Sequence, residues 1–131
     1  MMGVDLLVRD RTPGREAAEL LLSGLPQRIT LRDLIRTRVR EEVARFNADR
    51  GEVFRGFVRP DGAEETPAGY RVEVGRRIDW QKQARIAEKA FEENRFFVLV
   101  GGTQVGDLDA ELDLGVDTDV CFVRLVPLVG G

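Results

Sequence analysis

Histidine is absent from this chain of 131 residues, and cysteine occurs once, at Cys121. Without histidine there is no Ser/His/Asp or Cys/His arrangement, and the general base most often used near neutral pH is missing. One cysteine excludes an internal disulfide framework, and without histidine it excludes a Cys/His zinc site. We therefore expect Cys121 to be a core residue of a cytoplasmic protein. We expect no enzymatic activity, no cofactor and no metal.

Long apolar runs and a strong charge of one sign are also missing. No apolar run approaches the roughly 18 residues of a membrane span, and the opening "MMGVDLLVRD" has no cationic segment before an apolar one. The net charge of −3 gives no general attraction to nucleic acid or to an anionic membrane. We expect neither a nucleic-acid nor a membrane partner.

The acidic stretch "GDLDAELDLGVDTD" has alternating Asp residues that resemble a cation-binding loop. It lacks the Gly at the sixth position and the Glu at the twelfth that a calcium loop requires. We expect an exposed turn and strand edge here. Hydrophobic residues make up 43% of the chain, which is enough for the core of one domain of this length.

The first part of the chain predicts a hairpin followed by a helix. Val4, Leu6 and Val8 alternate with their neighbours as in a strand, and "AELLLSGL" is a second apolar run, so residues 3–25 form the hairpin. Thr30 is a natural N-cap with Asp33 three residues later, and the helix should end near residues 47–51. One side of this helix is apolar and should pack on a sheet, and its residues are Leu31, Leu34, Ile35, Val39, Val43 and Phe46.

The middle of the chain is less regular. "EVFRGFVRP" and "YRVEV" predict short strands on either side of an exposed loop, "DGAEETPAG". Asp79 should cap a second helix that runs to about Asn94. The stripe of Trp80, Ala84, Ala87 and Phe91 on this helix is typical of core packing.

The last third returns to strands. "FFVLV" is rich in aromatic and β-branched residues, "GGTQ" predicts a turn, and Val105 begins a short piece. "DVCFVRLV" is a continuous apolar run of the kind buried on both faces, which indicates a central strand.

This succession resembles the ubiquitin-like β-grasp family. The segment "FFVLVGGTQVGDLDAELDLGVDTDVCFVRLVPLVGG" is similar to the last third of ubiquitin, and "VDLLVRDRTPGREAAELLLSGLPQRITLRDLI" resembles its first hairpin and helix start. The resemblance implies an α+β fold, a mixed sheet with one helix across it, in a single domain over residues 1–131. Residues 50–95, with the second helix and a loop, would be an insertion, and 127–131 an exposed tail.

In that family the chain ends in Gly-Gly, and a partner enzyme uses ATP to adenylate the terminal carboxylate. Gly130 and Gly131 stand at the matching positions, and residues without Cβ can thread a narrow channel and leave the carbonyl open to attack. Pro127 should end strand pairing and free the tail. The resemblance implies conjugation through Gly131, with Pro127, Leu128 and Val129 recognised by the adenylating enzyme. Further partners would be a conjugating enzyme, a metallopeptidase and target proteins.

Two other functions stay open at this point. A sulfur carrier of the same family would bear a terminal thiocarboxylate, and a β-grasp interaction or assembly module would not use its glycines. The tail "VPLVGG" is apolar where ubiquitin's is basic, so an activating enzyme for ubiquitin should not accept it. Among 20 Lys and Arg residues only Lys82 and Lys89 are lysines, and these are the candidate acceptors for self-linked chains. The oligomeric state, a homo-oligomer included, is left undecided.

Overall fold

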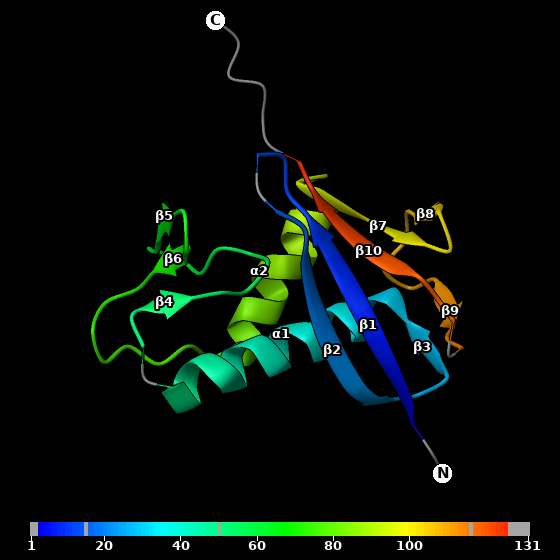
Figure 1. Ribbon diagram of the computed structural model, residues 1–131, viewed down its shortest axis with the longest axis horizontal. Coiled ribbons are helices and arrows are strands. Elements are labelled where there is room, and N and C mark those ends of the chain that lie inside the picture. Colours follow the sequence, from blue (N-terminus) through cyan, green and yellow to red (C-terminus); the bar gives the residue numbers. More distant parts are fainter. Residues whose placement is uncertain (1–2, 15, 50, 116, 126–131) are drawn as a thin grey trace, which may run out of the picture. The chain divides into compact units, whose positions relative to one another are not determined.

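The computed structural model describes residues 3–14, 16–49, 51–115 and 117–125, which have an α+β fold (Figure 1). The chain divides into two units, Met1–Asp33 together with Ala90–Gly131, and Leu34–Lys89. Both helices cross this division, because the first turn of α1 (Leu31–Asp49) and the last turn of α2 (Trp80–Glu92) belong to the first unit. Residues 50–89 of the expected insertion lie in the second unit, together with most of α1.

The first unit contains a mixed five-stranded sheet. In spatial order its strands are β2 (Ala18–Leu25), β1 (Val4–Arg11), β10 (Val120–Arg124), β7 (Phe96–Val100) and β8 (Thr103–Val105). β1 and β10 are parallel, and the other neighbours are antiparallel. Figure 1 shows β10 lying between β1 and β7.

The hairpin expected over residues 3–25 is confirmed as β1 and β2. Leu6 and Val8 are buried while Leu7 between them is exposed, so the alternation in sequence becomes an inner and an outer face. β2 follows the same rule, because Leu22 is buried and Leu21, which lies opposite Leu7, is half exposed.

The expected central strand is confirmed as β10. Val120, Cys121 and Phe122 are consecutive and all buried, which means that both faces of this strand are covered. Phe122 stacks on Phe96 with ring centroids 5.9 Å apart, and Phe96 meets Phe91 edge-on at 5.7 Å. These three rings form an aromatic part of the core of the first unit.

The turn before β8 is shorter than the sequence suggested. Gly101 and Gly102 have φ angles of 57° and 81°, and two such residues are enough for a tight hairpin turn. Thr103 and Gln104 therefore already belong to β8, and Val105 is its last residue and does not begin it. This corrects the expected four-residue turn.

The acidic stretch provides partners for the N-terminus of α1. Strand β9 (Glu111–Asp113) pairs with β3 (Arg28–Thr30), and the loop before it supplies two backbone acceptors. Leu31 N–H donates to Ala110 O at 3.0 Å, and Arg32 N–H donates to Leu108 O at 2.8 Å. Thr30 is the expected N-cap, since its Oγ1 accepts from Asp33 N–H at 3.1 Å. The helix N–H groups that lack intrahelical partners are thus satisfied.

The second unit contains most of both helices and a three-stranded sheet of order β4 (Val53–Phe54), β6 (Gly69–Arg71), β5 (Glu64–Thr66). The prediction that "DGAEETPAG" is an exposed loop was therefore wrong in part, because this segment contains β5. Gly69 permits this arrangement: its φ is 144°, and a Cβ there would lie 2.7 Å from Phe54 O. "YRVEV" is strand only through Arg71, and Val74 is 80% exposed.

Both helices largely match their expected boundaries and faces. α1 ends at Asp49, and all six residues of its expected apolar side are buried. Asp79 caps α2, because its Oδ1 accepts from Gln81 N–H at 3.0 Å. α2 ends at Glu92, two residues earlier than expected, since Asn94 has a left-handed φ of 59°. Of the expected stripe, Ala84, Ala87 and Phe91 are buried, whereas Trp80 is half-buried.

Truncation of Phe46 tests the buried side of α1. This side chain is 6% exposed, and its ring meets Phe54 edge-on at 5.7 Å. We expect Phe46→Ala to lower the free energy of unfolding by about 3–5 kcal/mol, because it removes a buried ring and leaves a cavity. The control is Val74→Ala at an exposed site, which should change stability by less than about 0.5 kcal/mol. Chemical denaturation measures both, and a loss below about 1 kcal/mol for Phe46→Ala would contradict the assignment of this face.

Candidate functional site

The last described residues mark where the chain leaves the sheet. β10 ends at Arg124, and the next residue, Leu125, donates its N–H to Arg95 O at 2.9 Å. Leu125 is 43% exposed, so the chain is at the surface at this point. The expected tail residues lie outside the described residues, and these are Pro127, Leu128, Val129, Gly130 and Gly131.

The end of α2 fixes the position of Arg95. Asn94 N–H donates to Phe91 O at 3.0 Å, and Arg95 N–H donates to Ala90 O at 2.9 Å. With Asn94 in the left-handed region, this pair of bonds is the Schellman motif that ends many helices. Asn accepts this conformation more readily than most residues with a Cβ. The motif therefore fixes the position of the Arg95 carbonyl, which accepts a hydrogen bond from Leu125 N–H where the chain leaves β10.

Cys121 lies in the strand that leads to this exit, and it is free and buried, as expected for a core residue. Burial raises the pKa of its thiol above the ordinary value, and the nearby Arg11 only partly opposes this shift. The thiol is therefore protonated near neutral pH. Because the thiolate is the reactive form, Cys121 is poorly suited to act as a nucleophile.

The two candidate acceptor lysines lie on α2 in the second unit, and both are exposed. They are seven residues apart, which places them on nearly the same side of the helix. Lys82 Nζ lies 3.7 Å from Asp61 Oδ2, in an ion pair whose two side chains are 58% and 66% exposed. Such an exposed pair is weak and leaves the amine accessible. The structure therefore places both lysines where an acyl group could reach them.

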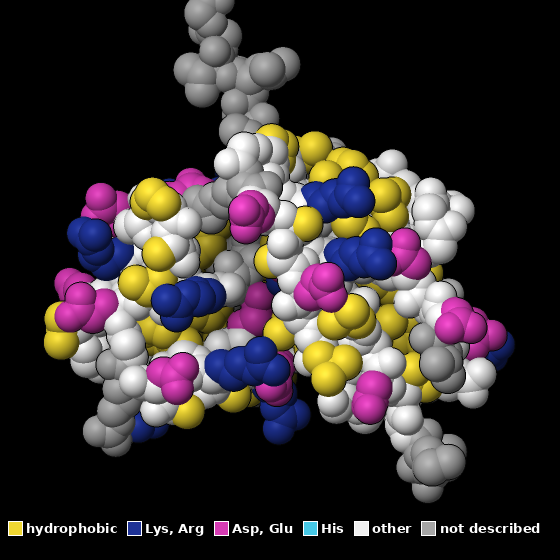
Figure 2. Space-filling view, viewed as in Figure 1, with side chains coloured by type: hydrophobic (Ala, Val, Ile, Leu, Met, Phe, Trp, Pro, Cys, Tyr) yellow, Lys and Arg dark blue, Asp and Glu magenta, His cyan; other side chains and the backbone are white. Residues whose placement is uncertain are grey.

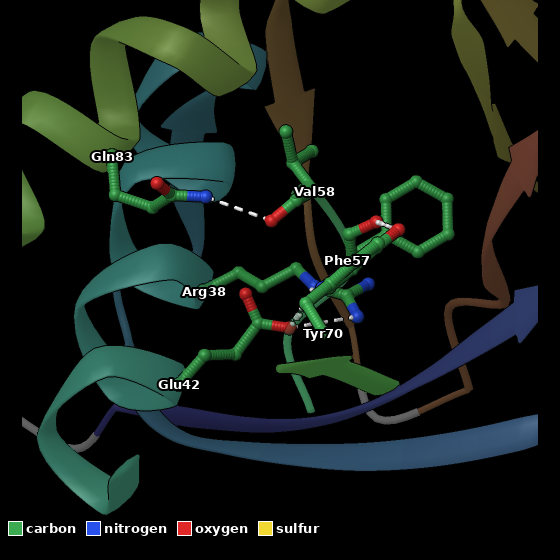
Figure 3. A network of polar contacts seen from close by, with 6 residues as sticks. All are labelled: Arg38, Glu42, Phe57, Val58, Tyr70 and Gln83. Carbon is green, nitrogen blue, oxygen red and sulfur yellow. Dashed lines mark hydrogen bonds and ion pairs between the residues drawn. The ribbon is translucent and has the colours of Figure 1, made fainter. Parts of the chain in front are cut away.

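The second unit also holds a buried polar network that the sequence did not reveal (Figure 3). Arg38 and Glu42, one turn apart on α1, have side chains that are 3% and 7% exposed, and Arg38 NH2 lies 3.2 Å from Glu42 Oε2. Glu42 Oε2 also accepts from Phe57 N–H at 2.9 Å. The Arg38 guanidinium lies 4.8 Å from the centre of the Phe57 ring. The pair thus holds the backbone and the ring of Phe57.

Two further side chains hold the same segment. Gln83 on α2 donates to Val58 O at 2.7 Å, and Tyr70 OH lies 3.5 Å from Phe57 O. Figure 3 shows Arg38, Glu42 and Gln83 pointing from the two helices toward residues 57 and 58. These contacts are made to backbone groups, to the Phe57 ring or between the members of the ion pair. The network is therefore suited to fix an irregular segment, and it contains no nucleophile beside a base.

A pocket of about 240 Å³ lies elsewhere in the second unit, lined by Phe46, Asn47, Gly51, Gly75, Arg76 and Arg77. Two of its polar side chains already form hydrogen bonds with backbone groups of the second unit. Asn47 exchanges two hydrogen bonds with the backbone of Ile78, at 3.0 and 3.1 Å, and Arg76 donates to Asp61 O at 2.7 Å. Nothing in this lining pairs a proton donor with an acceptor for acid–base chemistry.

Within residues 3–14, 16–49, 51–115 and 117–125, no group of three or more His, Cys, Asp or Glu side chains could hold a metal ion. In the same residues, no helix is both long enough and apolar enough to cross a membrane.

Comparison of the chain with protein-family models, with curated proteins and with solved structures found no match. The function proposed below therefore depends on the residues of this chain and on the arrangement of its strands.

The buried ion pair gives a prediction that can be tested by a double-mutant cycle. Arg38→Met should lower stability by about 3–5 kcal/mol, because it leaves the Glu42 carboxylate buried without its cation. Glu42→Gln should also be destabilising, although Gln can still accept from Phe57 N–H. In the double variant neither member of the pair is left as a buried charge without its partner, so its loss should be clearly smaller than the sum of the two single losses. Chemical denaturation of the four proteins measures this coupling, and additive losses would contradict it.

Proposed function

We propose that this chain is a ubiquitin-like protein modifier with a β-grasp fold, joined to target amines through the carboxylate of Gly131. If further residues follow Gly131 in the full protein, a peptidase must first expose this carboxylate. In the β-grasp family a hairpin precedes a helix, and the last strand runs in the centre of the sheet beside the first. The observation that carries the proposal is the position of β10.

The strand arrangement supports the fold assignment. β10 lies between β1, to which it is parallel, and β7, to which it is antiparallel, and β2 and β8 flank them. A parallel partner for the first strand is the feature that a simple succession of hairpins cannot produce. The strand that leads toward Gly130 and Gly131 is thus a buried central strand, and the chain reaches the surface at its end, at Leu125.

The residues after β10 support the chemistry. Pro127 has no N–H and is disfavoured within a central strand, so pairing should not continue far past Arg124. Two residues without Cβ at the end can enter a narrow catalytic channel in a partner enzyme. An adenylating enzyme would join the Gly131 carboxylate to the α-phosphate of ATP and release pyrophosphate. A target amine would then attack the acyl carbon, AMP would leave, and the amine would lose a proton.

The proposed partners follow from the resemblance to ubiquitin-like modifiers. They are an adenylating enzyme, a conjugating enzyme, target proteins, and a metallopeptidase that would expose or remove the modifier. We place these steps in the cytoplasm. Arg side chains occur in both units, but the side chains from Leu125 to Gly131 are uncharged. The proposed activating enzyme should therefore recognise an apolar tail through Pro127, Leu128 and Val129.

The proposal predicts a specific peptide in source cells. Trypsin cleaves after Arg124, so a target lysine joined to Gly131 should keep the remnant Leu125–Gly131 on its ε-amine. We expect mass spectrometry of tagged protein purified from those cells to find this remnant on target lysines. Deletion of Gly131 should abolish conjugation, because the reacting residue is lost, so neither this remnant nor a shortened one, Leu125–Gly130, should be found.

The matched control is Val74→Ala, an exposed change in the second unit, which should leave the remnant in place. Thermal unfolding should be the same for the deletion variant and the parent, since the change lies beyond the sheet. A thiocarboxylate at Gly131 without any remnant would identify a sulfur carrier instead. A shortened remnant, Leu125–Gly130, formed by the deletion variant in the same yield would show that conjugation does not require Gly131.

Self-linked chains should form only at three amines. Lys82, Lys89 and the N-terminal amine are the amino groups of the sequence, because an arginine guanidinium stays protonated near neutral pH and is a poor nucleophile. We expect a variant with Lys82→Arg, Lys89→Arg and a blocked N-terminus to give no amide-linked multimers in a reconstituted reaction. The parent protein is the control, and intact mass is the readout. Multimers that persist in the variant would refute this restriction.

A further inference from the structure

The pocket of about 240 Å³ in the second unit has walls that hydrogen bonds hold in place. Its lining comes from the last turn of α1, from the chain that follows this helix, and from residues 75–77. Asn47 in that last turn exchanges two hydrogen bonds with the backbone of Ile78, and Val72 N–H donates to Glu52 O at 2.8 Å. The segment that carries residues 75–77 is therefore tied on both sides.

A tight turn shapes this segment. Arg76 N–H donates to Glu73 O at 3.1 Å, and Gly75 between them has a φ of 80°, as at the third residue of a type II turn. The Arg76 side chain is also held, since its NH1 donates to Asp61 O at 2.7 Å. The pocket is thus formed before a ligand arrives, and a preformed site loses little conformational entropy on binding.

Two of the lining residues, Gly51 and Gly75, have no side chain to fill the pocket. A Cβ at Gly75 would meet no atom within 4 Å, and at Gly51 its nearest neighbour would be Val53 N at 4.0 Å. Ligand sites in proteins have volumes from about 300 Å³ upward, so this pocket is close to the lower end of that range. It therefore suits one small molecule.

The lining is cationic. The described residues that line it include Arg76 and Arg77 but no Asp or Glu, whereas Figure 2 shows basic and acidic side chains interspersed over the face that it presents. Arg77 is exposed and has no hydrogen bond or ion pair with another described residue. Phe46 adds an apolar surface to the same lining. Guanidinium groups bind carboxylates and phosphates through two parallel N–H···O bonds.

We propose that this pocket binds a small organic anion, whose carboxylate or phosphate pairs with the Arg77 guanidinium and whose apolar part lies against Phe46. Arg76 adds a second positive charge, and its bond to Asp61 O keeps it in place. Because the lining has no carboxylate of its own, an anion meets no like charge there. This binding is independent of conjugation, since it uses neither the tail residues nor the two lysines.

An NMR titration that follows the amide signal of Gly75 tests the site. We expect benzoate and phenyl phosphate to give saturable shifts, because each joins an anionic group to an aromatic ring. Benzyl alcohol lacks the charge and inorganic phosphate lacks the ring, so each should bind at least about tenfold more weakly than the matching anion. Added sodium chloride should weaken the binding of both organic anions, because it screens the charge of the arginines.

Three variants locate the anion. Arg77→Gln should weaken the binding of benzoate and phenyl phosphate at least about tenfold. Arg85→Gln is the matched control, an exposed arginine of α2 outside the lining, and should bind as the parent does. Gly51→Leu should weaken binding by filling the pocket, and Gly51 has no positive φ that would strain a side chain.

The proposal would be overturned by shifts that rise linearly without saturation, or by equal affinities in the Arg77 and Arg85 variants. Unchanged binding by Gly51→Leu would place the anion outside the pocket. Binding of benzyl alcohol as tight as that of benzoate would remove the role of the charge, and inorganic phosphate that binds as tightly as phenyl phosphate would remove the role of Phe46.

Discussion

Parallel pairing between β1 and β10 joins segments from opposite ends of the first unit. Val8 lies beside Val120, and Arg11 lies beside Val123. Within the described residues, β2 pairs with β1, β7 pairs with β10, and β8 pairs with β7, so the β1–β10 pair connects the two halves of the sheet. The chain must therefore pass through the whole second unit before its sheet can be completed. Pairing β1 with β10 closes a long loop. The conformational entropy of that loop is lost before the strands gain their contacts, and contacts between such distant segments slow folding.

Charged and polar side chains contribute much of the local structure in both units. Thr30 and Asp79 cap the two helices, and carbonyls from the acidic stretch accept from the first N–H groups of α1. Arg38 and Glu42 do more than cap, since they contact the backbone and the ring of Phe57 in an irregular segment. These charged and polar side chains thus contribute to the local structure through the backbone groups, the ring and the ion-pair partner that they contact.

The sequence predicted the helices and strands that are long enough to show a hydrophobic period or that begin at a clear capping residue. The β1–β2 hairpin, both helix caps and the buried central strand all followed from periodicity or from one well-placed residue such as Thr30. β5, with three residues, has no periodicity, and only its pairing with β6 makes it a strand. Gln83 could not be recognised as buried, because its partner is the distant carbonyl of Val58, and Arg38 could not because the Phe57 ring that it contacts is distant in the sequence. An Arg and a Glu four residues apart on the apolar side of α1 were the one available signal.

The candidate site was predicted from the sequence, and its tail residues, 127–131, lie outside the described residues. Lys82 and Lys89 were expected on a helix and are exposed there. The glycines at 130 and 131 stay a prediction from composition and from the family resemblance, since short apolar tails carry no period of their own. The role of Asn94 was missed, because a left-handed residue after a helix is most often Gly.

The direction of β1 and β10 also determines how the first unit responds to mechanical load. Val4 begins β1 and Arg124 ends β10, and since the strands are parallel these residues lie at opposite ends of the pair. Tension applied through them acts along the strands and loads all the hydrogen bonds between them together. Antiparallel terminal strands would instead be peeled apart one bond at a time. A protein joined to the end of this chain would thus pull along the β1–β10 pair and load it in shear. The rate at which the two strands separate under force would be governed by the unfolding rate.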